Sequence, residues 1–88
     1  LDLPVKASRL ALLNITDVNL ADDVDREELA AKTDGLSFAD LTGVLREAAL
    51  ATLRRDETAS EVGWHDLEAA LELFDDRRGP SADARGDN

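Results

Sequence analysis

The chain has 88 residues, of which 43% are hydrophobic, and its 20 acidic and 10 basic residues give a formal net charge of −10. This length allows one small core and excludes a second domain, while the negative charge argues against nucleic acid or an anionic membrane surface as a partner. Because cysteine is absent and His65 is the single histidine, the sequence provides no disulfide framework, no thiol nucleophile and no thiolate metal site.

The first residues resemble the end of a linker followed by a helix. Residues 1–3 alternate apolar and acidic side chains, and Pro4 suits the first turn of a helix. Apolar residues then recur at helical spacing through Ile15, which predicts a first helix over 4–15. We expect the chain to begin within a longer protein. No apolar run approaches the roughly 20 residues of a membrane span and no signal peptide is present, so we expect a cytoplasmic protein without a membrane partner.

The second predicted helix opens at Asp25 and closes at Gly35. An acidic N-cap followed three residues later by Glu28 is the capping-box pattern, in which each side chain satisfies an amide of the first turn. Gly35 supplies the left-handed conformation that often follows a helix end. The segment 17–24 lacks a helical period, which predicts a loop.

Ser37 and Asp40 repeat the capping pattern at the start of a third helix that extends to about Arg55. A polar loop over 56–61 follows, and a fourth helix begins at Gly63 or Trp64. We expect Trp64 to anchor this helix against the core. The apolar stripe of the fourth helix consists of Leu67, Ala70, Leu71 and Phe74.

The predicted fold class is therefore all-α. A small four-helix bundle occupies residues 4–76, after a linker end over 1–3. Residues 77–88 contain no large apolar side chain, which predicts a disordered C-terminal tail.

Five short segments, in this order and spacing, carry a resemblance to a known family. They are residues 3–9, 20–25, 29–41, 46–49 and 66–71, with the sequences LPVKASR, LADDVD, LAAKTDGLSFADL, REAA and DLEAAL. Together they closely resemble the C-terminal helical lid subdomain of AAA ATPases of the valosin-containing-protein-like and proteasomal regulatory types. The resemblance covers residues 3–74.

The resemblance implies that the chain completes the adenine and ribose side of an ATP site. In the family, the lid segment equivalent to Phe38 and Ala39 lies against the base and the ribose. The first helix adds an apolar contact and a polar side chain, which correspond by position to Leu12 and Thr16. Phe38 stands where the family usually has a small residue, so its ring packs either in the lid core or on the nucleotide base. Ala39 occupies the place of a phosphate-sensing arginine in related clades, so contacts to the γ-phosphate are not expected.

The resemblance also implies which parts of the machine lie elsewhere. The sequence has no phosphate-binding loop of the G-x-x-x-x-G-K-[ST] type and no apolar run that ends in paired acids. The implied cofactor is ATP or ADP, with Mg held by a core domain that this sequence lacks. The parent would be an ATP hydrolase, and this chain alone would not be catalytic. Its implied partners are its own core domain, adjacent subunits of a hexamer in a protein-remodelling ring, and protein substrates of the parent.

Two alternatives from other classes remain open at the level of sequence. An acyl-carrier-like protein would also be small, acidic and helical, with Ser37 opening a helix after Asp34 and Gly35. In this chain, however, Leu36 replaces the aspartate that precedes the modified serine of carriers. The other alternative is a stand-alone acidic helical adaptor that binds basic proteins.

Overall fold

The computed structural model describes the backbone of residues 3–83 and the side chains of residues 3–75. Within this part the only β-type pairing is an isolated bridge between Leu20 and Val62. The predicted all-α fold with four helices is therefore confirmed. The helices are α1 (Lys6–Ile15), α2 (Arg26–Lys32), α3 (Phe38–Arg55) and α4 (Trp64–Asp83).

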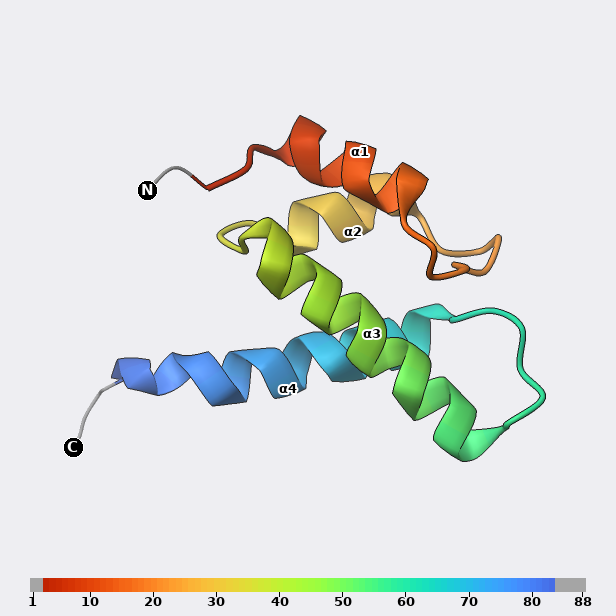
Figure 1. Cartoon of the computed structure of the whole chain (residues 1–88). Helices are drawn as coiled ribbons and strands as arrows, with labels where there is room; N and C mark the ends of the chain where they lie inside the picture. Colours follow the sequence, from red (N-terminus) through yellow and green to blue (C-terminus); the bar gives the residue numbers. More distant parts are fainter. Residues whose placement is uncertain (1–2, 84–88) are drawn as a thin grey trace.

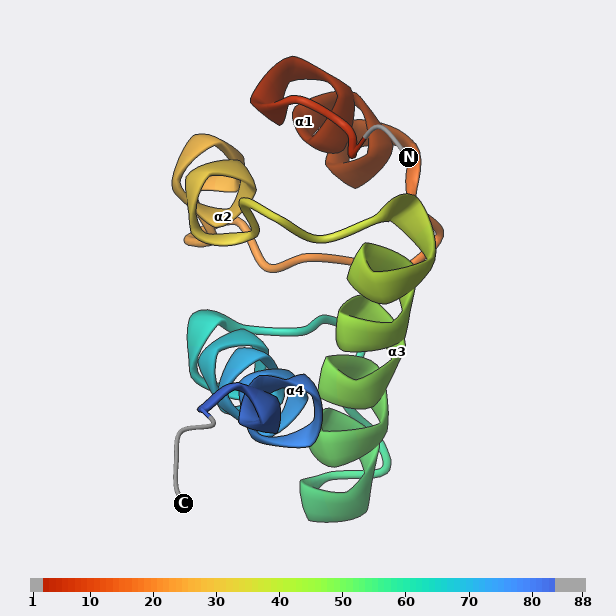
Figure 2. The same cartoon turned by 90° about the vertical axis from the view of Figure 1, so that its left-hand side faces the viewer.

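The helices form two packed pairs. Helices α1 and α2 lie side by side, and α3 packs along α4 (Figure 1). In the perpendicular view, α3 begins just below α1, at the level of α2, and runs down past α4 (Figure 2). The start of α3 therefore lies beside α1, whereas the rest of the helix lies against α4.

The core is aliphatic and receives side chains from every helix. Its largest fully buried apolar side chains are at most 2% exposed, and burial of each such side chain stabilises the fold by about 1.5–3 kcal/mol. Trp64 packs against this core, with the Lys32 ammonium 5.7 Å from its ring centroid. The expectation that Trp64 anchors α4 is confirmed. The large apolar core residues are Leu13, Leu29, Leu41, Val44, Leu45 and Leu67.

The two predicted caps differ in completeness. At the start of α3, the Asp40 amide donates to Ser37 Oγ at 3.1 Å and the Ser37 amide donates to Asp40 Oδ2 at 3.2 Å, so this capping box is confirmed. At the start of α2, Asp25 accepts from two first-turn amides. The expected second bond of this capping box, from the Asp25 amide to the Glu28 carboxylate, is wrong. The Glu28 carboxylate instead lies 3.9 Å from the Lys32 ammonium, one turn along the helix.

Helix α1 begins two residues later than expected. Val5 is extended, with φ −76° and ψ 168°, and its carbonyl accepts the first helical amide bonds, from Ser8 and Arg9. The Pro4 carbonyl instead accepts a hydrogen bond from the Arg9 guanidinium at 2.8 Å. A side chain in the first turn of the helix therefore holds the residue that precedes its N-cap.

Helix α2 ends at Lys32, before the expected boundary at Gly35. The Leu36 amide donates to the Thr33 carbonyl at 3.1 Å, which closes a turn between α2 and α3. Gly35 has a φ of 89° in this turn, so the left-handed conformation predicted for this residue is confirmed.

Helix α4 continues to Asp83, beyond the end expected near Asp76. The expected end rested on the composition of residues 77–88, which include Gly, Pro, Ser and Asp but no large apolar side chain, whereas the helix continues over 77–83. The remainder of the expected tail, residues 84–88, lies outside the described residues.

The two longer loops are joined by hydrogen bonds. The Ala21 amide donates to the Val62 carbonyl at 2.9 Å, and the Val62 amide donates to the Asn19 carbonyl at 2.8 Å. The Asn19 side-chain amide donates to the Ser60 carbonyl at 2.6 Å. These contacts connect the α1–α2 loop to the α3–α4 loop and hold the two helix pairs together.

Candidate functional site

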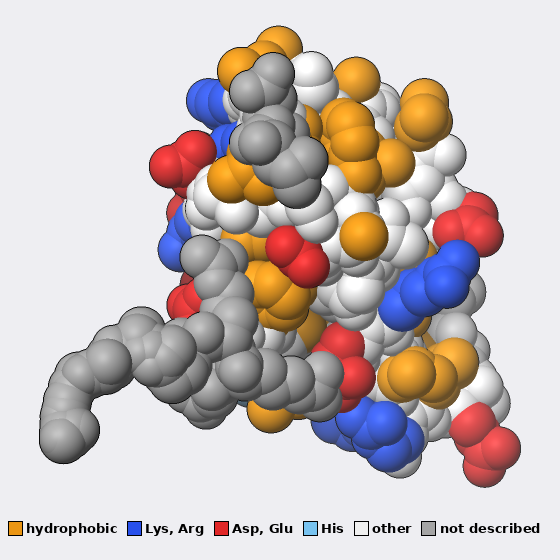
Figure 3. Space-filling view, turned by 60° about the vertical axis from the view of Figure 1, so that its left-hand side comes forward, with side chains coloured by type: hydrophobic (Ala, Val, Ile, Leu, Met, Phe, Trp, Pro, Cys, Tyr) orange, Lys and Arg blue, Asp and Glu red, His pale blue; other side chains and the backbone are white. Residues whose placement is uncertain are grey.

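An apolar hollow of about 390 Å³ lies between α1 and the first residue of α3. Phe38 forms one side and is 48% exposed, and Ile15 on α1 is 78% exposed. The space-filling view shows hydrophobic side chains gathered at the end of the molecule occupied by α1 (Figure 3). The side chains that line the hollow carry no charge, so it suits a flat apolar ligand surface. They belong to Ser8, Ala11, Leu12, Ile15 and Phe38.

The position of Phe38 follows from the turn that precedes it. Gly35 reverses the chain in a left-handed conformation, and Ser37 caps α3 through the Asp40 amide. Phe38 is therefore the first residue of the helix, where the side chain leaves the bundle beside α1. The first amides of a helix have no intrahelical acceptor, so polar backbone lies next to the apolar hollow.

The structure brings together two of the four residues expected to contact nucleotide. Leu12 and Phe38 line the same hollow. Ala39 lines a different hollow, between α3 and α4. Thr16 ends α1, and its hydroxyl accepts a hydrogen bond from the Val18 amide at 3.2 Å, so it terminates the helix and does not line the hollow.

Phe38 does not pack in the lid core, so the core-packing interpretation of its ring is wrong. The ring is 48% exposed, whereas the core positions of α3 that follow it, Leu41 and Leu45, are at most 1% exposed. The reason is geometric, because the side chain of the first helical residue lies above the end of the bundle and not between its helices. The other interpretation, contact with a bound nucleotide, stays a prediction.

Arg9 was not singled out from the sequence, although it is one of the most buried polar residues, at 2% exposed. Its Nε and Nη2 donate to the Ala30 carbonyl at 3.1 and 2.7 Å, and Nε also donates to Thr33 Oγ1 at 3.1 Å. Its Nη1 donates to the Pro4 carbonyl. The available signal was its spacing, because Arg9 lies four residues before the buried Leu13 on the inner face of α1.

A second polar cluster joins α3 to α4. Asp66 is 5% exposed and accepts hydrogen bonds from the Thr52 hydroxyl and from the Arg55 guanidinium. The Thr52 bond, followed by the charge and hydrogen bond of Arg55, lowers the pKa of Asp66, while burial acts in the opposite direction. The sequence placed Asp66 in the first turn of a helix but gave no sign of its partners. This cluster is remote from the Phe38 hollow and holds the two helices together.

The part of the chain that the structure describes contains no group of three or more acidic, histidine or cysteine side chains placed to hold a metal ion. None of its helices combines the length and the apolar character that crossing a membrane requires.

The AAA+ lid domain family matches residues 23–69, which is more than half of the chain. The chain belongs to this family. The matched range begins before α2 and ends within α4, so it includes the turn at Gly35, the capping box and Phe38. The resemblance to the lid of AAA ATPases is therefore confirmed. Membership also disfavours the carrier and adaptor alternatives, and the Ser37 hydroxyl is occupied as a helix cap.

Relatives of this AAA+ lid domain are much longer proteins. The chain is 49% identical over 74 residues to the ATP-dependent zinc metalloprotease FtsH 3 of Sphaerobacter thermophilus, covering 82% of this chain and 15% of that protein. It is 43% identical over 60 residues to Protein CdcH of Halobacterium salinarum, covering 68% and 8%. It is 42% identical over 65 residues to proteasome-activating nucleotidase 1 of the same organism, covering 74% and 16%. The chain thus spans less than a fifth of each of these relatives.

Proposed function

We propose that this lid completes the adenine and ribose side of an ATP site whose phosphate-binding part belongs to a core domain of the same ATPase. The single observation that carries the proposal is the hollow in which Leu12 and Phe38 meet. Family membership and the ATP dependence in the name of the Sphaerobacter relative support the choice of nucleotide.

The chemistry of the hollow matches the base better than the phosphates. A purine has two apolar faces, and an exposed phenyl ring can stack on one of them while Leu12 contacts the edge. The lining offers no cation to neutralise phosphate charge. Phosphates and Mg would therefore be held by the core, with hydrolysis taking place there. Thr16 and Ala39 lie outside the hollow, so the proposal rests on Leu12 and Phe38.

The wider role that we propose is transmission of nucleotide state between core, lid and the next subunit of a ring. The outer face of α3 provides a surface for such a neighbour, since Leu50 and Leu53 are 52% and 46% exposed. Arg54 lies beside them and forms an ion pair with Glu47 at 3.3 Å. Protein substrates for the parent are proposed from relatives whose names describe a metalloprotease and a proteasome-activating nucleotidase.

The test compares Phe38→Ala with Leu73→Ala in the full-length ATPase. Phe38 and Leu73 are 48% and 37% exposed, so both variants remove a large, partly exposed apolar side chain, but only Phe38 lines the hollow. Loss of an aromatic stack worth about 0.5–1.5 kcal/mol should weaken ADP binding roughly 2- to 10-fold in Phe38→Ala. Leu73→Ala should bind ADP as the wild type does. Equal affinity in the wild type and Phe38→Ala, measured by titration calorimetry, would show that the hollow is not part of the nucleotide site.

A further inference from the structure

The guanidinium of Arg9 joins three segments that are separate in the sequence. It lies on α1, donates to the Pro4 carbonyl of the entering chain at 2.8 Å, and donates to the Ala30 carbonyl in the last turn of α2 at 2.7 and 3.1 Å. It also donates to the Thr33 hydroxyl, which itself lies 3.0 Å from the Leu29 and Ala30 carbonyls. The entering segment and the end of α2 are thus held by one rigid planar group.

The partners of Arg9 indicate that its side chain positions the backbone segments around it, since they are mostly carbonyl groups and not carboxylates that would neutralise its charge. Its side chain is 3% exposed, and the carboxylate of Asp34, its one ion-pair partner in the described structure, lies 3.8 Å away and is 92% exposed. Most of its hydrogen bonds go to backbone carbonyls. A buried ion pair often contributes no more to stability than an apolar residue of similar volume would. The distinctive property of an arginine here is that its fork holds acceptors on two sides at fixed angles.

The residues that Arg9 contacts at the end of α2 are followed closely in the chain by Phe38, which lines the hollow. Thr33, whose hydroxyl accepts from Arg9, also accepts the Leu36 amide through its carbonyl at 3.1 Å. Ser37, the next residue, caps α3, and Phe38 follows as its first residue. Four residues therefore separate Thr33, which the guanidinium contacts, from Phe38, whose ring lines the hollow, and the turn between them is hydrogen-bonded.

We propose that Arg9 is a positioning residue that locks the direction of the entering chain at Pro4 to the α2–α3 turn that carries Phe38. This inference rests on the proposed function, since it assigns to Arg9 the coupling of the core-to-lid linker to the nucleotide hollow. Through this contact, a change in the angle of the linker moves α2 and the Phe38 turn as one body. Arg9 itself lies outside the hollow and does not contact the nucleotide.

The first experiment needs no nucleotide and uses the 88-residue chain. Arg9→Lys keeps the positive charge but lacks the planar fork that holds the Pro4 and Ala30 carbonyls at fixed angles. Backbone NMR relaxation should show lower order parameters for the Leu3 and Val5 amides in Arg9→Lys. The control is Thr52→Val, which removes a buried hydrogen bond between α3 and α4 and should leave these two amides unchanged.

The second experiment measures coupling in the full-length ATPase, with one spin label on the core and one at the exposed Ala31 of α2. The width of the core-to-lid distance distribution should at least double in Arg9→Lys in the presence of either ADP or an ATP analogue. The ATPase kcat should fall at least fivefold, while ADP affinity should change less than twofold. Thr33→Val removes the hydroxyl that accepts from Arg9 and donates to the α2 carbonyls, and it should broaden the distribution in the same sense but less.

The outcomes separate this inference from the proposed function. An unchanged distribution in both Arg9→Lys and Thr33→Val, or an equal broadening in Thr52→Val, would overturn the role of Arg9. If Arg9→Lys broadens the distribution although Phe38→Ala binds ADP normally, Arg9 still couples the linker to the lid. In that case it is the proposed nucleotide-binding role of the hollow that is overturned. Should Arg9→Lys not fold, Thr33→Val alone decides the question by the same measurement.

Discussion

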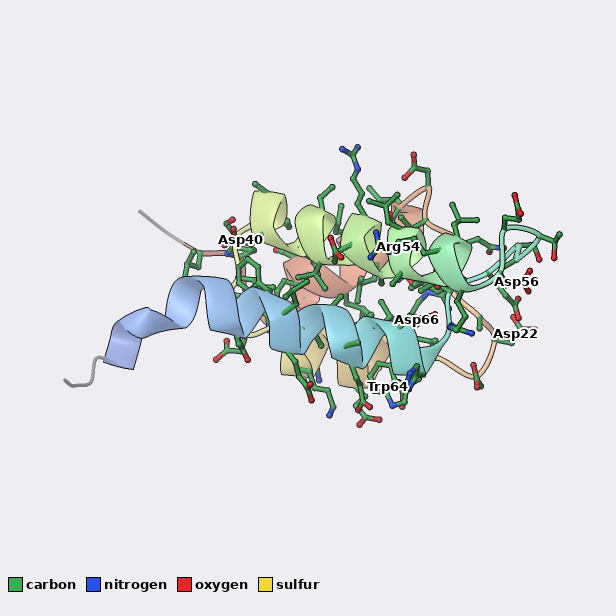
Figure 4. All side chains as sticks on the ribbon, turned by 90° about the horizontal axis from the view of Figure 1, so that it is seen from below. Asp22, Asp40, Arg54, Asp56, Trp64 and Asp66 are labelled. Carbon is green, nitrogen blue, oxygen red and sulfur yellow. The ribbon has the colours of Figure 1, made fainter. Side chains whose placement is uncertain are left out.

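Asp66, near the start of α4, accepts a hydrogen bond from the Thr52 hydroxyl of α3, with 2.6 Å between the two oxygens. Figure 4 places Asp66 between these two helices, at the end where the α3–α4 loop joins them. The hydroxyl also lies 3.0 Å from the Ala48 carbonyl, but its one hydrogen is drawn to the shorter and charged acceptor. A buried carboxylate therefore fixes the crossing of the two longest helices.

We expect Asp66→Asn to destabilise the fold by about 1–3 kcal/mol, because it removes the charge from a buried acceptor of two hydrogen bonds. Urea unfolding followed by circular dichroism at 222 nm measures this change. Asp23→Asn, in the exposed α1–α2 loop, is the matched control and should change the free energy of unfolding by less than about 0.5 kcal/mol. Similar losses in both variants would mean that the Asp66 contacts contribute little.

The lowered pKa of Asp66 predicts a dependence of stability on acid pH. Its pKa in the folded chain lies below the ordinary value of about 3.9, so the carboxylate stabilises the fold fully above that value. This contribution is lost as the pH falls through the folded pKa. Exposed Asp56 acts in the same direction, because hydrogen bonds from Thr58 lower its pKa. The urea midpoint should therefore fall from about pH 5 downwards, and less steeply in Asp66→Asn. Parallel curves for the two proteins would contradict the prediction.

The capping box at α3 predicts a cost for Ser37→Ala. This variant removes the acceptor of the Asp40 amide, which lies 3.1 Å from Ser37 Oγ, and should destabilise the fold by about 0.5–2 kcal/mol. Ser60→Ala, in the exposed α3–α4 loop, serves as the control and should have little effect. Thermal unfolding of the two variants measures the difference. A loss in Ser60→Ala as large as that in Ser37→Ala would show that the cap is not its cause.

Replacement of two glycines by alanine should change the free energy of unfolding in opposite directions. Gly35 has a φ of 89°, so Gly35→Ala forces an L-residue into a left-handed conformation at a cost of about 1–2 kcal/mol. Gly43 lies within α3 and has open space around the position of an added Cβ, so Gly43→Ala should stabilise the helix by about 0.5–1 kcal/mol. Urea midpoints that shift in the same direction for both variants would contradict this prediction.

Local signals predicted most of the secondary structure. The Ser37 and Asp40 pair gave the start of α3 because a capping box involves only residues within one turn. The predicted start of α1 and the predicted C-terminal end of α4 were less accurate. The start of α1 depends on a contact between the Pro4 carbonyl and Arg9, which lies on the next turn and itself reaches α2. Helix periodicity contains no information about such a contact.

The candidate site was predicted only in part, for a related reason. Leu12 and Phe38 were both named from the family resemblance, and the fold brings them to one hollow. Ala39 was named with Phe38 from the same family resemblance, but successive residues on a helix differ in direction by about 100°. Ala39 therefore lies on the α4 side of α3.

The sequence by itself determined the four helices, the cap at Ser37, the left-handed turn at Gly35 and the family, because each depends on residue types at short, fixed spacings. The tertiary structure alone decided which polar groups are buried. Arg9 and Asp66 look like ordinary surface charges in the sequence, yet they are 2% and 5% exposed. Their burial is stable because their partners, Ala30 and Thr52, come from other helices. Such pairing arises only when the helices pack, since an unpaired charge would be too costly to bury.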